Sequence, residues 1–330
     1  MSVARMLDRH WDEILTKSLP PGLPDEEVKI EPILVDITDA ANWIYTETDQ
    51  EYFDWREDFP TIISPWPITW MEFMRSSVTR SEGQQWVMPE QALHRMGALA
   101  LNWEIKEEQR ALTWQVDPIL RWQMQCGKLM GKPQVYPSEQ IEARRMACMK
   151  YATKGLAPRW ISMWEVYLEL VRDKSCHHLM SAAFYLDEDG KLFDEVLMIH
   201  TDQPVGDGIF TILIPFFYGI SLMHCGNVSV VPVGSDRKPN PRHGHDPRAC
   251  YHVLDIKPIH RMAAASKMGS SSVKRALHIC RGHFKDYRKS GLFGHYKGIY
   301  WWDMQARGTI EKGEVKKDYR VRRGNDVIQD

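Results

Sequence analysis

The feature that most constrains the fold is an apolar run without charged residues, GIFTILIPFFYGISLM, at positions 208–223. Such a run has to be buried, because its side chains gain free energy by leaving water. It is shorter than the roughly 18–20 apolar residues that cross a bilayer. Pro215 and Gly219 interrupt it, and neither residue favours a continuous helix. We therefore predict two buried strands over 208–223 and no membrane-spanning segment.

Apolar residues in strand-like patterns between turn signals predict further strands. The ranges are 29–38, 68–75, 97–105 with 109–117 as a meander, 228–234, 251–256, and 180–202 as a hairpin that turns at 187–190. Helical spacing and capping residues predict helices over 3–17, 38–45, 118–131, 138–155, 158–174 and 270–290. Together these elements predict an α+β fold with a helix-rich middle and a β-rich second half.

The composition predicts two regions along the chain. Residues 1–175 form an N-terminal α+β region with an acidic start and a helical middle. Residues 176–330 form a β-rich region with a basic C-terminal helix and strands. A chain of 330 residues is long enough for two average domains or one large domain, so the two regions also fit one compact domain.

Charge is distributed unevenly between the two ends of the chain. Residues 1–90 contain 7 Lys/Arg and 18 Asp/Glu, a balance of −11, and residues 257–330 contain 17 Lys/Arg and 7 Asp/Glu, a balance of +10. A basic end of this kind suits a polyanion such as nucleic acid. The same asymmetry also fits an acidic segment and a basic segment that interact with each other.

Cysteine usage and the N-terminus predict a cytoplasmic protein. The six cysteines are scattered without a C-x-x-C pair, which favours buried thiols over a disulfide framework. Residues 1–18 carry charge throughout and lack the apolar core of a signal peptide.

Glu72 is a carboxylate among large apolar residues of a predicted strand, with Trp70, Met71, Phe73 and Met74 around it. Strand alternation favours a side chain that faces solvent. The alternative is burial with a partner, because an unpaired buried carboxylate is costly.

The loop around 243–252 contains the residue types of a divalent-metal site. His243, His245, Cys250 and His252 are the candidate ligands, and His-x-His in an extended segment points both rings the same way. The spacing matches no zinc signature, so the stronger expectation is that the protein holds no cofactor. The sequence CHH at 176–178 is a weaker metal candidate.

The most informative segment is HICRGHFKDYRKSGLFGHYKGIYWW at 278–302. On a helix, His278, Arg281, Lys285 and Arg288 share one face, and on the strand after it Tyr300 and Trp302 face away from Trp301. Such a surface suits phosphate contact and base stacking. We therefore expect phosphate contacts from Arg281, Lys285, Arg288 and Lys297 and stacking from Tyr287, Tyr296 and Trp301. The alternative is a set of solvated cations beside a tryptophan core.

The same segment offers residues for cleavage of RNA without a metal. His278 or His283 would transfer the proton and the neighbouring cations would stabilise the phosphorane. The chain contains no G-x-S-x-G, no H-E-x-x-H and no Walker-type phosphate loop. Whether the protein is an enzyme stays open at this point.

Two short pieces resemble proteins of bacteriophages and prophages. The first is H-x-x-R-G-H-F-x-x-Y with LFG, G-x-x-W and ARG after it, and the second is PWPITWMEF at 65–73. They cover about a tenth of the chain. The resemblance implies a viral or mobile-element origin and carries no activity with it.

These observations favour a phage-encoded protein that binds nucleic acid or another polyanion through its basic C-terminal region, with metal-independent ribonuclease activity as an extension. The alternative is a non-enzymatic protein that docks on a host or viral protein through its acidic 1–90 segment.

Overall fold

The computed structural model of the chain describes residues 6–7, 9–10, 14, 32–47, 58–75, 78–81, 84–87, 94–121, 138–170, 174–193, 198–200, 209–233, 251–257, 276–280, 282–302, 305–307 and 309–314. Backbone contacts divide the chain into two compact units, Met1–Ile256 and Lys257–Asp330. No described helix is long and apolar enough to span a membrane.

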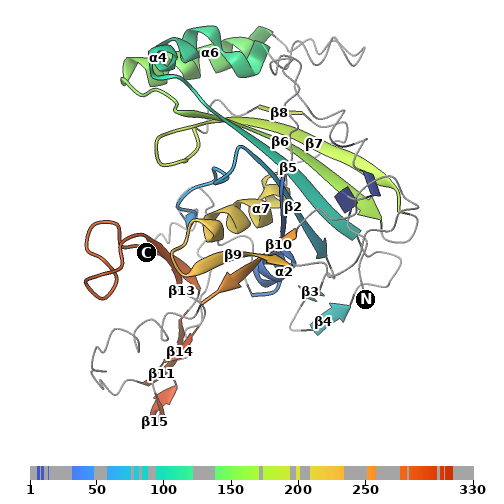
Figure 1. The fold of residues 1–330 in the computed structure, drawn as a ribbon, viewed down its shortest axis with the longest axis vertical. Helices are drawn as coiled ribbons and strands as arrows, with labels where there is room; N and C mark the ends of the chain where they lie inside the picture. The colour runs from blue at the N-terminus through green and yellow to red at the C-terminus, as the bar shows by residue number, and fades with distance from the viewer. Residues whose placement is uncertain are drawn as a thin grey trace, which may run out of the picture. The chain divides into compact units, whose positions relative to one another are not determined.

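The first unit is built on one eight-stranded sheet (Figure 1). The strand order is β8-β7-β6-β5-β2-β1-β10-β9, and β1 is parallel to β2 and β10 whereas the other neighbours are antiparallel. The strands are β1 (Ile33–Asp36), β2 (Ile68–Arg75), β5 (His94–Glu104), β6 (Trp160–Leu170), β7 (Cys176–Leu186), β8 (Met198–His200), β9 (Val228–Val233) and β10 (Tyr251–Ile256). A separate hairpin pairs β3 (Val78–Ser81) with β4 (Gln84–Val87). Residues 1–175 and 176–330 thus both contribute strands to the large sheet.

Helix α7 (Ile209–Met223) packs on one face of this sheet, next to α2 (Thr38–Glu47). Phe73 of β2 meets Phe216 of α7 with ring centroids 5.2 Å apart, and Trp164 of β6 meets Phe217 edge-on, also at 5.2 Å. All four rings are fully buried. This aromatic layer contributes to the apolar burial between α7 and the sheet.

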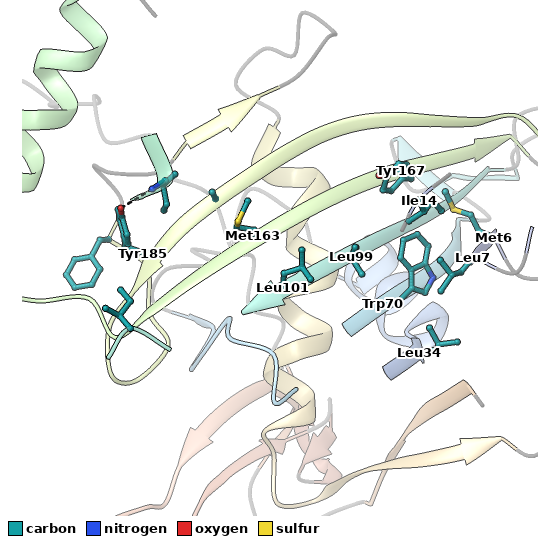
Figure 2. Packing of buried hydrophobic residues seen from close by; sticks show 14 of the residues in the cluster. Met6, Leu7, Ile14, Leu34, Trp70, Leu99, Leu101, Met163, Tyr167 and Tyr185 are labelled. Carbon is teal, nitrogen blue, oxygen red and sulfur yellow. Dashed lines mark hydrogen bonds between the residues drawn. The ribbon is translucent and has the colours of Figure 1, made fainter. Parts of the chain in front are cut away.

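The other face of the sheet has its own buried cluster (Figure 2). Because neighbouring strand residues point to opposite faces, Met163 contributes to this cluster although Trp164 faces α7. The N-terminal residues Met6, Leu7 and Ile14 cover one part of it. Residues of α4 (Glu107–Val116) and α6 (Ser138–Thr153) cover another part. The strands that contribute to both clusters are therefore buried on both faces. Figure 1 shows α4 and α6 at the end of the sheet away from α2.

Glu72 is buried with partners, so the prediction that it faces solvent is wrong and the alternative is correct. The residue is 3% exposed. Trp70 Nε1 donates a hydrogen bond to Glu72 Oε2 at 3.1 Å, and Arg95 Nη1 lies 3.5 Å from Glu72 Oε1. Gly97 lies opposite Glu72 on β5, and a Cβ there would be only 2.3 Å from Cζ2 of Trp70. The missing side chain at Gly97 makes room for the indole ring that holds the carboxylate.

The prediction of two strands over 208–223 is wrong, because residues 209–223 form the single helix α7. The run is about twice as long as a typical buried strand, and length rather than periodicity separates a buried strand from a buried helix. Pro215 lies inside the helix. Gly219 lets α7 approach Ile37 closely, since a Cβ there would be 3.1 Å from Ile37 Cγ2.

The helix-rich middle is also wrong, and strands dominate the described part of the chain. Residues 160–170 form β6 instead of the helix expected over 158–174, because their Trp, Ile, Val and Tyr side chains fit a strand with a neighbour on each side. Residues 107–116 form α4 instead of the strand expected over 109–117. The coarser expectation of a mixed fold of helices and strands is confirmed.

Several expected elements are confirmed. Strands are present where they were expected over 29–38, 68–75, 97–105, 228–234 and 251–256, and helices where they were expected over 38–45 and 138–155, although β5 begins before residue 97 and α2 ends after residue 45. The hairpin over 180–202 is present as antiparallel β7 and β8, with the turn at 187–190. Of the cysteines described, Cys148 and Cys225 are buried and Cys176 is half-buried.

The second unit contains two small sheets. One consists of β11 (Ala276–Cys280), β14 (Gln305–Arg307) and β15 (Thr309–Glu314), and the other pairs β12 (His283–Asp286) with β13 (Ile299–Trp302). The helix expected over 270–290 is therefore wrong for the described residues of that range. The spacing of the cations in this range fits a helix. Residues 283–286 form a strand instead, because they pair with the aromatic residues of β13.

Candidate nucleic-acid interface

The segment 282–302 forms an antiparallel hairpin. His283 lies opposite Trp302, Phe284 opposite Trp301, and Lys285 opposite Tyr300. Side chains of directly paired residues share a face, and adjacent residues point to opposite faces. One face therefore carries His283, Lys285, Tyr300 and Trp302.

Aromatic rings and a cation lie together on this face. The rings of His283 and Trp302 are nearly parallel, at 12°, with centroids 6.5 Å apart. The ammonium nitrogen of Lys285 lies 5.1 Å from the ring centroid of Trp302 and 5.8 Å from that of Tyr287. Both distances fall within the range of cation–π attraction. We call His283, Lys285, Tyr287 and Trp302 the aromatic–cationic face.

A small buried cluster that includes residues of this same face holds the face in place. Leu292 and Tyr300 are 3% and 4% exposed, and Tyr287, Phe293 and Trp302 pack against them. The backbone between the strands folds back on itself through hydrogen bonds from Tyr287 N to Gly298 O at 2.7 Å and from Leu292 N to Tyr296 O at 2.6 Å. Because Tyr287 and Trp302 belong to this core, their rings have limited freedom to rotate.

The hairpin segment carries a net positive charge. Residues 282–302 contain Lys285, Arg288, Lys289 and Lys297 against one acidic residue, Asp286. Arg288 donates from Nε and Nη2 to Asp286 Oδ2 at 2.9 and 2.8 Å. These hydrogen bonds lower the pKa of Asp286, so the carboxylate stays ionised and its charge is balanced by Arg288. The three lysines remain as the net charge of the segment.

The predicted phosphate-binding and catalytic residues are only partly brought together. Lys285, Arg288 and Lys297 are exposed, and so is His283. The backbone of His278 belongs to β11, a strand separate from the hairpin, whereas Arg281 lies outside the described residues. These residues therefore do not share one helix face, and their individual roles remain predictions.

The predicted stacking residues have different environments. Tyr287 belongs to the aromatic–cationic face, and Tyr296 is exposed in the connection. Trp301 is 2% exposed and packs on Phe284 with centroids 4.8 Å apart, on the other side of the hairpin. Trp302, which sequence reasoning did not propose for stacking, is the tryptophan beside His283 and Lys285. The sequence predicts that Trp302 and Trp301 point to opposite faces, but it does not predict that Trp302 pairs with His283.

Most of the candidate metal ligands lie outside the described residues. His243, His245 and Cys250 lie outside the described residues. His252 is on β10, where its Nδ1 lies 3.2 Å from the carbonyl oxygen of Leu34. Among the described residues, no group of three or more His, Cys, Asp or Glu side chains is placed to hold a metal ion, and this includes the CHH sequence.

A second polar cluster, missed by sequence reasoning, lies on the large sheet. Glu165 Oε2 accepts a hydrogen bond from Ser181 Oγ at 2.6 Å and lies 2.7 Å from His178 Nε2. Ser181 Oγ is 3.3 Å from the same His178 nitrogen. A Ser-His-carboxylate relay needs the serine and the carboxylate on different ring nitrogens. The cluster therefore satisfies a buried carboxylate and does not activate the serine.

Comparison of the chain with protein-family models, curated proteins and solved structures found no match.

Proposed function

We propose that the second unit binds nucleic acid through the aromatic–cationic face. The observation that carries the proposal is the position of the exposed Lys285 ammonium beside the rings of Trp302 and Tyr287. Proteins that bind nucleic-acid strands combine cations for the phosphates with aromatic rings for the bases. The net charge of 282–302, with Asp286 already balanced by Arg288, supports the same assignment.

The test is binding of a fluorescent 20-nucleotide oligouridine, measured by anisotropy between 50 and 200 mM salt. We expect the affinity to fall steeply with salt, because lysines that contact phosphate release counterions. Replacing Lys285, Lys289 and Lys297 together with Gln should lower the salt slope by about 2–3 and weaken binding at least about tenfold at the lowest salt.

The matched control replaces three exposed lysines of the first unit, Lys106, Lys154 and Lys191, with Gln. It removes the same charge from the whole protein and should leave the salt slope unchanged. Equal effects of the two triple variants would mean that binding follows net charge only. Absence of binding, or a flat salt response, would contradict the proposal and favour the docking alternative. Gel analysis of the same RNA reports any cleavage.

A further inference from the structure

Resting on the proposed function, we infer that the aromatic–cationic face takes single-stranded nucleic acid, with one unpaired base stacked on the ring pair of His283 and Trp302. The two rings are nearly parallel, and their centroids are 6.5 Å apart. Direct cross-strand pairing places the two side chains on the same side of the hairpin, with their ring planes in nearly the same orientation. Two rings oriented in this way offer faces on which the planar ring of a base can stack.

The face of a base, rather than its edge, is what such a ring pair recognises. In a duplex, neighbouring base pairs cover both faces of each base, and proteins reach only base edges and the backbone. In a single strand the faces are accessible, and aromatic side chains including His stack on them. The ring pair therefore selects unpaired strands of either RNA or DNA.

Lys285 is placed for the phosphate of the same strand. Its ammonium nitrogen is 5.1 Å from the centroid of the Trp302 ring, and the side chain is exposed. A strand whose base stacks at Trp302 brings its backbone phosphates close to this cation. His283 and Lys285 then have separable roles: the ring contacts the base, and the ammonium contacts the backbone.

The experiment compares four labelled 20-mers on the full chain: oligouridine RNA, oligothymidine DNA, an abasic DNA strand with the same phosphates, and a 20-base-pair DNA duplex. Oligouridine and oligothymidine should bind more tightly than the abasic strand and the duplex. His283→Ala should weaken binding of both base-containing single strands about 5- to 100-fold. It should leave the abasic strand and the salt slope unchanged, because no phosphate contact is removed.

Two variants control for structure and ring chemistry. His283→Phe keeps a ring at the exposed position and should restore most of the affinity. His295→Ala removes a second exposed histidine of the same hairpin segment, away from the ring pair, and should have no effect. Both variants keep the buried core residues Leu292 and Tyr300, so a loss of folding is not expected and is checked by circular dichroism.

The possible failures are distinguishable. If all four 20-mers bind equally and His283→Ala changes nothing while the lysine triple variant still weakens binding, nucleic-acid binding stands and the stacking inference is overturned. If His283→Ala weakens the abasic strand as much as oligothymidine, His283 does not contact a base and the inference is again overturned. If none of the 20-mers binds, the proposed function fails and the inference fails with it.

Discussion

Arg144 and Asp117 form a bidentate ion pair in the interior of the first unit. Arg144 Nε donates to Asp117 Oδ2 at 2.5 Å, and Nη2 donates to Oδ1 at 2.9 Å. The hydroxyl of Tyr185 donates to the same Oδ1 at 2.8 Å. Asp117 follows α4, Arg144 belongs to α6 and Tyr185 to β7, so one carboxylate connects two helices to the sheet.

Replacing Arg144 with Met should therefore destabilise the protein strongly. The substitution keeps a long apolar stem but leaves the buried carboxylate of Asp117 without its counter-charge, which costs about 3–5 kcal/mol. Urea unfolding followed by circular dichroism measures the change. Arg145→Met is the matched control, since the Arg145 side chain is 71% exposed, and should change stability by less than about 0.5 kcal/mol. Equal midpoints for the two variants would contradict the prediction.

Gly97→Ala should destabilise the protein by about 1–3 kcal/mol, because the new methyl group overpacks the core. The added Cβ would lie 2.3 and 2.6 Å from two atoms of the Trp70 ring. A double-mutant cycle with Trp70→Phe isolates that overlap, since the smaller ring leaves room at position 97. The cost of Gly97→Ala should be clearly smaller in the Trp70→Phe background. An unchanged cost would show that the indole ring is not the obstacle.

The stability should fall as the pH drops from 7.5 to 5.5, in part through His224. Burial lowers the pKa of this imidazole, and its Nε2 lies 2.8 Å from the carbonyl oxygen of Ile63. The unfolded chain has an ordinary histidine pKa of about 6.5 and takes up a proton first. The contribution of His224 is therefore fully present above about pH 6.5 and is lost as the pH falls toward the lower folded-state pKa.

The control for this pH dependence is His224→Gln, whose amide can donate to the same carbonyl but does not titrate. Urea midpoints of both proteins at pH 7.5 and 5.5 are compared. The loss of stability between the two pH values should be smaller in the variant, and parallel losses would contradict the role of His224.

Cys148 should be nearly inert toward alkylation while the protein is folded. Burial, followed by the nearby Asp117 charge, raises the pKa of its thiol to about 11. At pH 8 only about one thiol in a thousand is then ionised, and the thiolate is the reactive form. Iodoacetamide labelling read by mass spectrometry should be at least about a hundredfold slower at Cys148 in the native protein than in urea. Similar rates in both states would contradict the prediction.

The sequence predicts the helices and strands that are determined by neighbouring residues in the chain. The strand over 68–75 follows Pro67 and is strongly apolar, and the helix predicted over 38–45 begins at Thr38, where the residue types Thr and Asp favour a helix start. The prediction of two strands over 208–223 is wrong because a buried helix accommodates both Pro215 and Gly219, and the length of the run favours a helix. Glu72 could not be resolved from sequence, because its partner Arg95 comes from another strand.

The sequence predicts which residues belong to the candidate site, but not how they are arranged in space. The basic and aromatic residues of 278–302 were identified, and Lys285 is where a cation was expected to be exposed. The cross-strand pair of His283 and Trp302 depends on a hairpin register over nineteen residues of sequence separation. The helical spacing of the cations favours a helix over the same residues. The pairing of β12 with β13, which local sequence does not predict, makes them a strand instead.

Strand β1 also sets the order in which the protein can assemble during synthesis. Leu34 pairs with Trp70 on one side and with Tyr251 on the other. At typical translation rates the ribosome needs about 10–45 s to proceed from residue 34 to residue 251. Throughout that interval one edge of β1 lacks its neighbour, and an open edge is a template for other chains. The nascent chain is therefore most in need of a chaperone before β10 has left the ribosome.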